Sequence, residues 1–201
     1  TEANNLAILG ISARRNPKKT RILVSAIEHK SVLAVAHIAS ERWKIKVDSI
    51  PVDSNGIIIL EYFKKFLSDD VFLVSLMHVN NEIGSIQPIP EISKLSHQFG
   101  ALVHTDAVQG LNLGTFRVEE MGVDLASFSA HKIYGPKGIG ALYVARHLQN
   151  QIEPQIYGGG QQNGLRAGTV PVWLCVGFAM AAQLTVQPEA EAERRRIQNL
   201  R

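Results

Sequence analysis

The chain contains little of what would place it in several large classes of protein. It has one cysteine in 201 residues, so a disulfide framework is excluded and a reducing compartment such as the cytoplasm is expected. No apolar run approaches the roughly 20 residues that a membrane-spanning helix needs. A formal net charge of +3 is too small to indicate nucleic-acid binding by itself. We therefore expect neither a membrane nor a nucleic acid among its partners.

Short apolar runs do occur, and they alternate with segments of helical spacing. The expected strands are 21–27, 44–52, 71–77, 139–144 and the runs that end at Asp106 and Ser129; the expected helices are 30–43, 60–66, 90–99 and 171–187. This alternation predicts an α/β fold, in which a mostly parallel sheet is covered by helices on both faces. The last of these helices is apolar on all sides, so we expect it to be long and largely buried.

The most informative segment is residues 129–140, which follows an apolar run and leads into a turn rich in glycine and proline. It places a hydroxyl (Ser129), an imidazole (His131) and an amine (Lys132) together at the predicted end of a strand. A lysine in such a place can form a Schiff base with a carbonyl compound if its neighbours keep it deprotonated. Most lysines are solvated surface charges, so this interpretation depends on what lies opposite Lys132.

Asp106 ends another predicted strand, and parallel strands end at the edge where open α/β sheets bind ligands. A carboxylate facing Lys132 across that edge suits pyridoxal phosphate: Asp106 would hold a proton on the pyridine nitrogen, while Lys132 carries the aldehyde carbon. The alternative is that Asp106 only caps a helix. His104 and Asp106 alternate like a ligand pair, but no Cys/His grouping has zinc spacing, so we expect no metal.

Six segments occur in a fixed order over nearly the whole chain: residues 1–8, 28–30, 78–84, 104–109, 129–140 and 158–169. In composition, order and spacing they resemble the motifs of the cysteine desulfurases, a branch of the class V aminotransferase group of pyridoxal-phosphate enzymes. The form of residues 78–84 is more similar to the branch that serves general iron–sulfur assembly. The resemblance implies the large domain of a fold-type I pyridoxal-phosphate enzyme.

The resemblance also implies a set of site residues. Lys132 and His29 would be catalytic, and the cofactor would be bound by Thr1, His29, Asn81, Asp106, Gln109, Ser129, His131, Lys132 and Thr169. In the family, the histidine matching His29 stacks on the cofactor ring and is proposed to move protons. Ser129, His131 and Thr1 match phosphate donors, and Thr169 matches a residue that reaches the phosphate of the neighbouring subunit, which implies a homodimer.

From the residues alone, blander roles stay open for several of these side chains. His29 could simply cap the following helix, and Asn81 and Gln109 could be ordinary polar residues of a turn and a helix surface. Thr1 is expected to open a helix whose free amides would add to a phosphate cradle.

The implied reaction removes sulfur from L-cysteine and leaves alanine and an enzyme persulfide for a sulfur acceptor or iron–sulfur scaffold protein. The family's nucleophilic cysteine and its arginine for the substrate carboxylate lie downstream of the segments matched here. Cys175 stands in an apolar run and is expected to be buried and inert. We therefore expect residues 1–201 to be an incomplete large domain lacking both ends and inactive alone, with about 171–201 as the long helix that leads toward a small domain.

Two alternatives remain. A selenocysteine lyase, or another eliminating or transaminating enzyme of class V, would share these residues, and release of selenide or sulfide would separate the cases. A non-catalytic assembly or scaffold module would need neither Lys132 nor Asp106. A protein that stays colourless with added cofactor would favour that second alternative.

Overall fold

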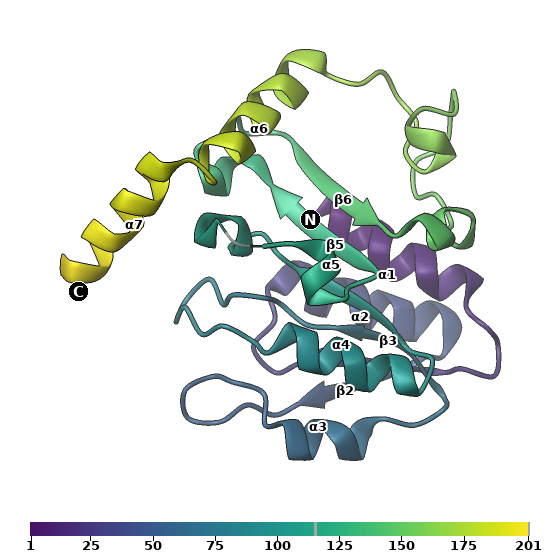
Figure 1. Ribbon diagram of the computed structural model, residues 1–201. Coiled ribbons are helices and arrows are strands. Elements are labelled where there is room, and N and C mark those ends of the chain that lie inside the picture. The colour runs from purple at the N-terminus through teal and green to yellow at the C-terminus, as the bar shows by residue number, and fades with distance from the viewer. Residues whose placement is uncertain (115, 201) are drawn as a thin grey trace.

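The computed structural model describes residues 1–114 and 116–200, which build one six-stranded sheet between helices (Figure 1). The strands are β1 (Arg21–Ser25), β2 (Lys46–Ile50), β3 (Val71–Ser75), β4 (Leu102–Asp106), β5 (Leu125–Ser129) and β6 (Gly140–Val144). Their order across the sheet is β2-β1-β3-β4-β5-β6, and only β6 runs antiparallel to its neighbour. The mostly parallel α/β fold predicted from the sequence is confirmed.

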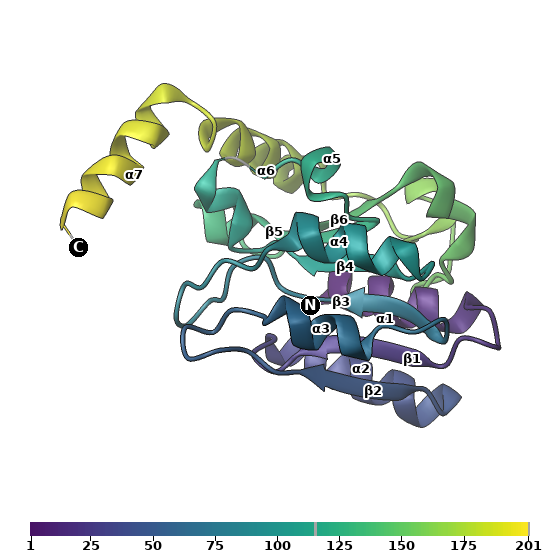
Figure 2. The same cartoon turned by 60° about the horizontal axis from the view of Figure 1, so that its bottom comes forward.

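Helices cover both faces of the sheet (Figure 2). They are α1 (Glu2–Arg14), α2 (Lys30–Trp43), α3 (Leu60–Phe66), α4 (Ile89–Gln98), α5 (Val118–Met121), α6 (Val172–Leu184) and α7 (Pro188–Leu200), with 3₁₀ turns η1 (Gly110–Leu113), η2 (Ala130–Ile133), η3 (Arg146–Gln151) and η4 (Gln162–Gly164). Ile22 and Val24 of β1 pack with α1 and α2, whereas Leu23 packs with α3 and α4. Alternate residues of the strand thus serve two separate hydrophobic cores.

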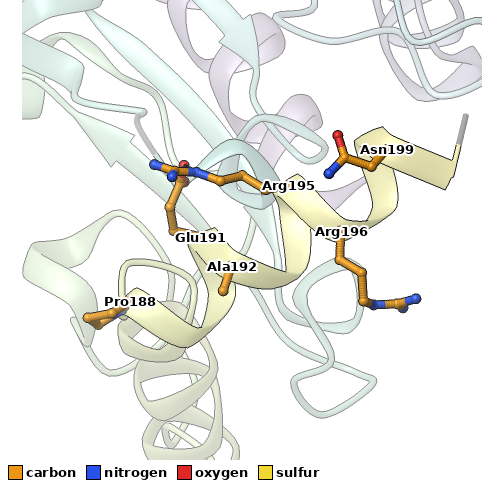
Figure 3. Close-up of a pocket in the computed structure, with 6 residues that line it drawn as sticks. All are labelled: Pro188, Glu191, Ala192, Arg195, Arg196 and Asn199. Carbon is orange, nitrogen blue, oxygen red and sulfur yellow. Dashed lines mark hydrogen bonds and ion pairs between the residues drawn. The ribbon is translucent and has the colours of Figure 1, made fainter.

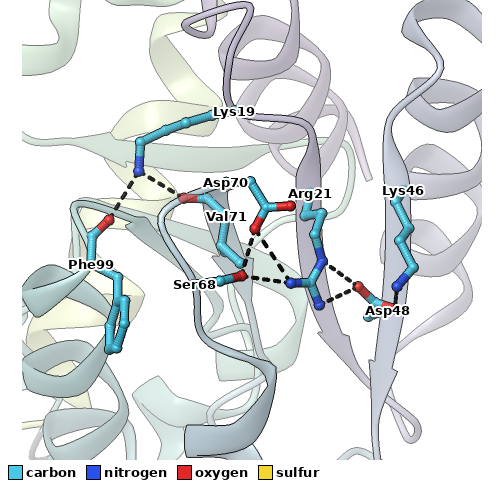
Figure 4. Close-up of polar contacts among 8 residues, drawn as sticks. All are labelled: Lys19, Arg21, Lys46, Asp48, Ser68, Asp70, Val71 and Phe99. Carbon is cyan, nitrogen blue, oxygen red and sulfur yellow. Dashed lines mark hydrogen bonds and ion pairs between the residues drawn. The ribbon is translucent and has the colours of Figure 1, made fainter.

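Polar side chains tie together the edge of the sheet where the parallel strands begin (Figure 4). The Lys19 ammonium donates to the carbonyl oxygens of Val71 and Phe99, at 2.9 Å each. Arg21 holds Asp48 of β2 through Nε at 2.8 Å and through a second nitrogen at 2.7 Å. Such a two-point contact fixes orientation as well as distance, so β1, β2 and β3 start in a defined register.

The helix expected at 171–187 is present, but the prediction that it is buried was wrong. Among the residues of α6, only Ala181 is buried, and Trp173 is 76% exposed. The helix contacts η2, while Trp173, Val176 and Met180 are exposed. Figure 1 shows α6 lying beyond β6, at the side of the molecule from which α7 extends. Cys175 is accordingly half-buried rather than buried.

Residues 171–200 form two helices rather than one. Thr185 closes α6, and α7 begins at Pro188. A proline lacks the amide hydrogen that a continuous helix needs and disfavours a helical conformation in the residue before it. Within the part of the chain that the structure describes, no helix combines the length and apolarity needed to cross a bilayer.

Candidate functional site

A cavity of about 230 Å³ opens at the edge of the sheet where β1, β3, β4 and β5 end. The residues that line it are Thr1, Asn4, His29, Ser31, Met77, Val79, Asn81, Asp106, Val108, Gln109, Ser129, His131 and Lys132. They come from the start of α1 and from the segments that follow four different strands. Every site residue predicted from the sequence is among them except Thr169, which lies exposed beyond η4.

Asp106 is the most constrained charged residue in the cavity. It ends β4 and is 6% exposed. Its Oδ1 accepts a hydrogen bond from the Val108 amide at 3.1 Å, and its Oδ2 accepts one from Asn4 Nδ2 at 2.9 Å. The alternative that Asp106 only caps a helix does not describe it, since the next helical turn begins after Gln109. The two donors hold the carboxylate in one orientation.

His29 has the capping role considered for it and also lines the cavity. It is the N-cap of α2, where its Nδ1 accepts a hydrogen bond from the Ser31 amide at 3.1 Å. The same nitrogen lies 2.7 Å from Ser31 Oγ. The ring nevertheless lines the cavity. A capping histidine is held by a helix end, so its ring has a defined orientation there.

The hydroxyl, imidazole and amine groups of the cavity come from the end of β5 and the turn η2 that follows it. Ser129 Oγ lies 2.8 Å from His131 Nδ1. Asn112 donates to the backbone carbonyl of Lys132 at 2.9 Å, which anchors the lysine's backbone while its side chain stays exposed. Thr1 opens the 13-residue helix α1 at the same cavity. Helix amides, hydroxyls and an imidazole gathered in this way suit an anionic group such as a phosphate.

Beneath the cavity lies a buried carboxyl group that the sequence reasoning did not assign. Glu28 is 6% exposed, and its Oε1 accepts hydrogen bonds from Ser25 Oγ at 2.6 Å and from the Met77 amide at 2.7 Å. Burial raises the pKa of Glu28 to about 8, and the nearby charge of Asp106 acts in the same direction. In the sequence, the only indication of a role for Glu28 is that it lies in the segment 28–30.

His104 is also buried, directly before the cavity in β4. Its ring nitrogens lie 2.8 Å from Ser75 Oγ and 2.9 Å from Ser127 Oγ. Burial lowers the pKa of His104 to about 4, against a smaller raising effect of Asp106. The ring is therefore neutral near pH 7 and serves as a hydrogen-bonded core residue. Among the described residues no group of three or more His, Cys, Asp or Glu side chains could hold a metal ion.

A larger hollow, of about 610 Å³, lies along α7 (Figure 3). Its lining residues are Pro188, Glu191, Ala192, Arg195, Arg196 and Asn199, all from one helix. Glu191 and Arg195 pair at 3.0 Å, as residues four apart on an exposed helix commonly do. Among residues 1–114 and 116–200, no side chain from another element lines this surface, so it lacks the arrangement of a binding site.

A model of the aminotransferase class-V family matches residues 1–201. The chain belongs to this family. Its curated relatives include a protein named cysteine desulfurase IscS from Rickettsia massiliae, which is 48% identical over 185 residues. That match covers 92% of this chain and 45% of the relative, so the class V chain spans about half the length of the curated relatives it matches.

Solved structures of similar proteins agree with the fold. A NifS-like protein superposes with a TM-score of 0.90 at 40% identity, over 96% of this class V chain and 53% of that one. A structure described as SspA in complex with cysteine superposes with a TM-score of 0.84 at 39% identity, over 90% of this chain and 52% of the other. In both, the similar region is again about half of the known protein.

Proposed function

We propose that this chain is the large, cofactor-binding part of a cysteine desulfurase that uses pyridoxal phosphate to remove sulfur from L-cysteine. The observation that carries the proposal is the meeting of Lys132, Asp106 and His29 in one cavity, from segments far apart in the sequence. The names of the curated relatives and the neighbour in complex with cysteine support the choice of substrate. Under this proposal the products are alanine and a persulfide on a cysteine.

The donor set of the cavity fits the cofactor. Asp106 offers a fixed carboxylate to a protonated pyridine nitrogen, and Lys132 offers an exposed amine to an aldehyde. Ser129, His131 and the amides at the start of α1 offer donors to a phosphate. When bound, pyridoxal phosphate supplies an electron sink for the charge that develops on the substrate carbon.

The chain's own residues then have separate tasks. With the cofactor bound, the Asp106 carboxylate would face the pyridine nitrogen, in the orientation that Asn4 and the Val108 amide fix by donating to its two oxygens. Lys132 would hold and release protons at Nζ, and His29 would lie against the cofactor ring. Asn81 and Gln109 contribute neutral polar groups to the cavity wall, suited to the ring's phenolic oxygen or a substrate carboxylate.

The sulfur nucleophile of this proposal is not Cys175. That thiol is half-buried in α6 and is not among the residues that line the cavity. We assign the nucleophile to a cysteine outside these 201 residues, and with it the handover to a sulfur acceptor or iron–sulfur scaffold protein. A cytoplasmic location and the division of residues 1–201 as an incomplete large domain belong to the same proposal.

The proposal also includes a homodimer. The apolar face of α6 begins shortly after Thr169, and both are exposed. A second copy placed on α6 would cover that face and bring Thr169 toward the neighbouring cavity, whereas Thr169 is not among the residues that line the 230 Å³ cavity of its own chain. Closed two-fold pairs are the commonest way in which identical chains associate.

Cofactor attachment is the first test. The protein is incubated with pyridoxal phosphate and reduced with borohydride, and the modified peptide is identified by mass spectrometry. We expect a stoichiometric adduct on Lys132 that is lost in Lys132→Ala and reduced in Asp106→Ala. Lys137→Ala, an exposed lysine of the same turn, is the matched control and should leave the adduct intact. No adduct, or adducts scattered over many lysines, would contradict the proposal and favour a non-catalytic module.

A further inference from the structure

A continuous hydrogen-bonded chain connects Asp106 to His29 across three elements. Asn4 of α1 donates from Nδ2 to Asp106 Oδ2 at 2.9 Å and to Ser31 Oγ at 2.9 Å. Ser31 of α2 then meets His29 Nδ1 twice, through its backbone amide at 3.1 Å and its hydroxyl at 2.7 Å. Asn4 and Ser31, to which the proposed reaction gives no chemical step, therefore connect the side chains of Asp106 and His29.

The direction of each hydrogen bond can be worked out from chemistry. A backbone amide can only donate, so His29 Nδ1 must accept from the Ser31 amide and carry no proton in the neutral ring. The Ser31 hydroxyl accepts from Asn4, which leaves its own hydrogen free to point at the same Nδ1. In neutral imidazole the single proton then resides on Nε2.

The orientation of the Asn4 amide is fixed as well. Asn4 is 1% exposed, and turning its side chain over would place Oδ1 against the carboxylate oxygen of Asp106. Two acceptors facing each other in a buried position are unfavourable, so Nδ2 remains the atom between Asp106 and Ser31. Asn4 Oδ1 has no partner among the described residues, which indicates that the Nδ2 contacts decide the orientation.

We propose that Asn4 and Ser31 are positioning residues that hold neutral His29 as the Nε2–H tautomer. The imidazole then presents a hydrogen-bond donor to the cavity rather than a base. The inference deepens the proposed function and rests on it for the identity of the bound molecule. The partner of His29 is then an acceptor atom, such as an oxygen of the cofactor or substrate. Proton acceptance in the reaction falls to Lys132.

Nitrogen-15 spectra of histidine side chains test this directly, in protein labelled on histidine and measured without cofactor. The His29 signals are identified by their loss in His29→Gln. At a pH where the ring is neutral, we expect a pyridine-like shift for Nδ1 and a pyrrole-like shift for Nε2. Ser31→Ala keeps the backbone amide that donates to Nδ1 but loses the shorter contact from the hydroxyl. Both shifts should therefore move part of the way toward the average of a tautomer mixture, with a smaller movement in Asn4→Ala. Ser31→Thr keeps the hydroxyl and should restore the wild-type spectrum.

An Nδ1–H tautomer in the wild type, or spectra unchanged in Ser31→Ala, would overturn the inference. The readout needs no turnover and no cofactor, so it is independent of the adduct on Lys132. A correct tautomer together with a failed Lys132 adduct would therefore overturn the proposed function and leave the role of Ser31 standing. The same spectrum in Lys132→Ala is expected to match the wild type, because Lys132 makes no contact in the chain from Asp106 to His29.

Discussion

Burial raises the pKa of Glu28 well above the usual value of a glutamate. The folded protein keeps its proton up to about pH 8, whereas the unfolded chain releases it above about pH 4.5. The free energy of unfolding therefore falls as the pH rises through that window. Glu28→Gln, which resembles the protonated acid, removes this dependence. Measured by urea unfolding at about pH 5 and about pH 8, the stability of Glu28→Gln relative to the wild type should increase with pH.

A matched control separates this effect from a general dependence on carboxyl groups. Glu91 lies exposed on α4, and Glu91→Gln should show no comparable gain between the two pH values. Equal behaviour of the two variants would mean that Glu28 is ionised in the folded protein and that its burial is compensated in another way.

Asp106 carries the second prediction at the scale of single residues. Asp106→Asn keeps the shape of the side chain but removes the charge proposed to face the pyridine nitrogen. It also sets an amide NH2 against one of the two groups that donate to Asp106, Asn4 Nδ2 or the Val108 amide. In the full-length enzyme that carries the proposed nucleophile, we expect kcat for L-cysteine to fall on the order of 100-fold or more, the usual loss when a preorganised electrostatic group is removed. Asp70→Asn, on the far edge of the sheet, should leave turnover unchanged. Near-normal turnover of Asp106→Asn would contradict the proposal that the Asp106 charge faces the pyridine nitrogen.

The sequence predicted the residues whose side chains would touch a bound molecule themselves. It did not reveal the residues that act by orienting a neighbouring side chain. Lys132 and Asp106 were predicted from their places at strand ends, and both line the cavity. Asn4 and Ser31 give no such signal, because an amide in a helix and a serine after a cap are common. Their contribution depends on the approach of α1 to α2, which is a property of the packed molecule.

At the scale of elements, the strands were placed correctly but drawn too long. The run 71–77 was predicted as one strand, whereas β3 ends at Ser75. Leu76 and Met77 are buried like strand residues, at 0% and 3% exposure, so hydrophobicity alone does not reveal where the strand stops. Met77 in fact lines the cavity and donates its amide to Glu28. The run 21–27 was also predicted too long, since β1 ends at Ser25 and Ala26 is exposed.

The seating of α1 on the rest of the fold gives a prediction at this scale. A Cβ on Gly10 would lie 2.5 Å from Ile152 Cγ2 and 2.9 Å from the Glu153 carbonyl oxygen. Gly10→Ala should therefore destabilise the protein by about 1–3 kcal/mol through overpacking, despite the better helix propensity of alanine. Denaturant unfolding measures the change.

Gly177 provides the matched comparison, since it is also a glycine inside a helix. Its Cβ would lie 3.1 Å from Pro136 Cγ, the outer part of a side-chain ring, and would meet no backbone atom within 4 Å among its nearest neighbours. Gly177→Ala should change stability by less than about 1 kcal/mol. If the two substitutions cost the same, close packing of α1 on residues 152–153 is not what requires glycine at position 10.

At the scale of the whole molecule, the error about α6 has a simple cause. Apolarity on all sides of residues 171–187 predicts that the helix is covered, but it does not say by what. In the described chain α6 contacts η2 and leaves Trp173, Val176 and Met180 exposed. These three residues lie on adjoining turns of the helix, so they form one apolar face. If the apolar face of α6 is buried at all, the atoms that cover it must come from outside the described residues.

That face yields the last prediction. Under the proposed homodimer, Trp173→Lys places a charge where the second copy should pack. The dissociation constant of the dimer should rise about 30-fold or more, as for removal of an aromatic anchor worth at least about 2 kcal/mol. Sedimentation equilibrium measures it, with Leu33→Lys on α2 as the control for adding a lysine to an exposed apolar site. A dimer equally weakened by both variants, or by neither, would place the second copy away from α6, and Thr169 would then lose its proposed route to the neighbouring cavity.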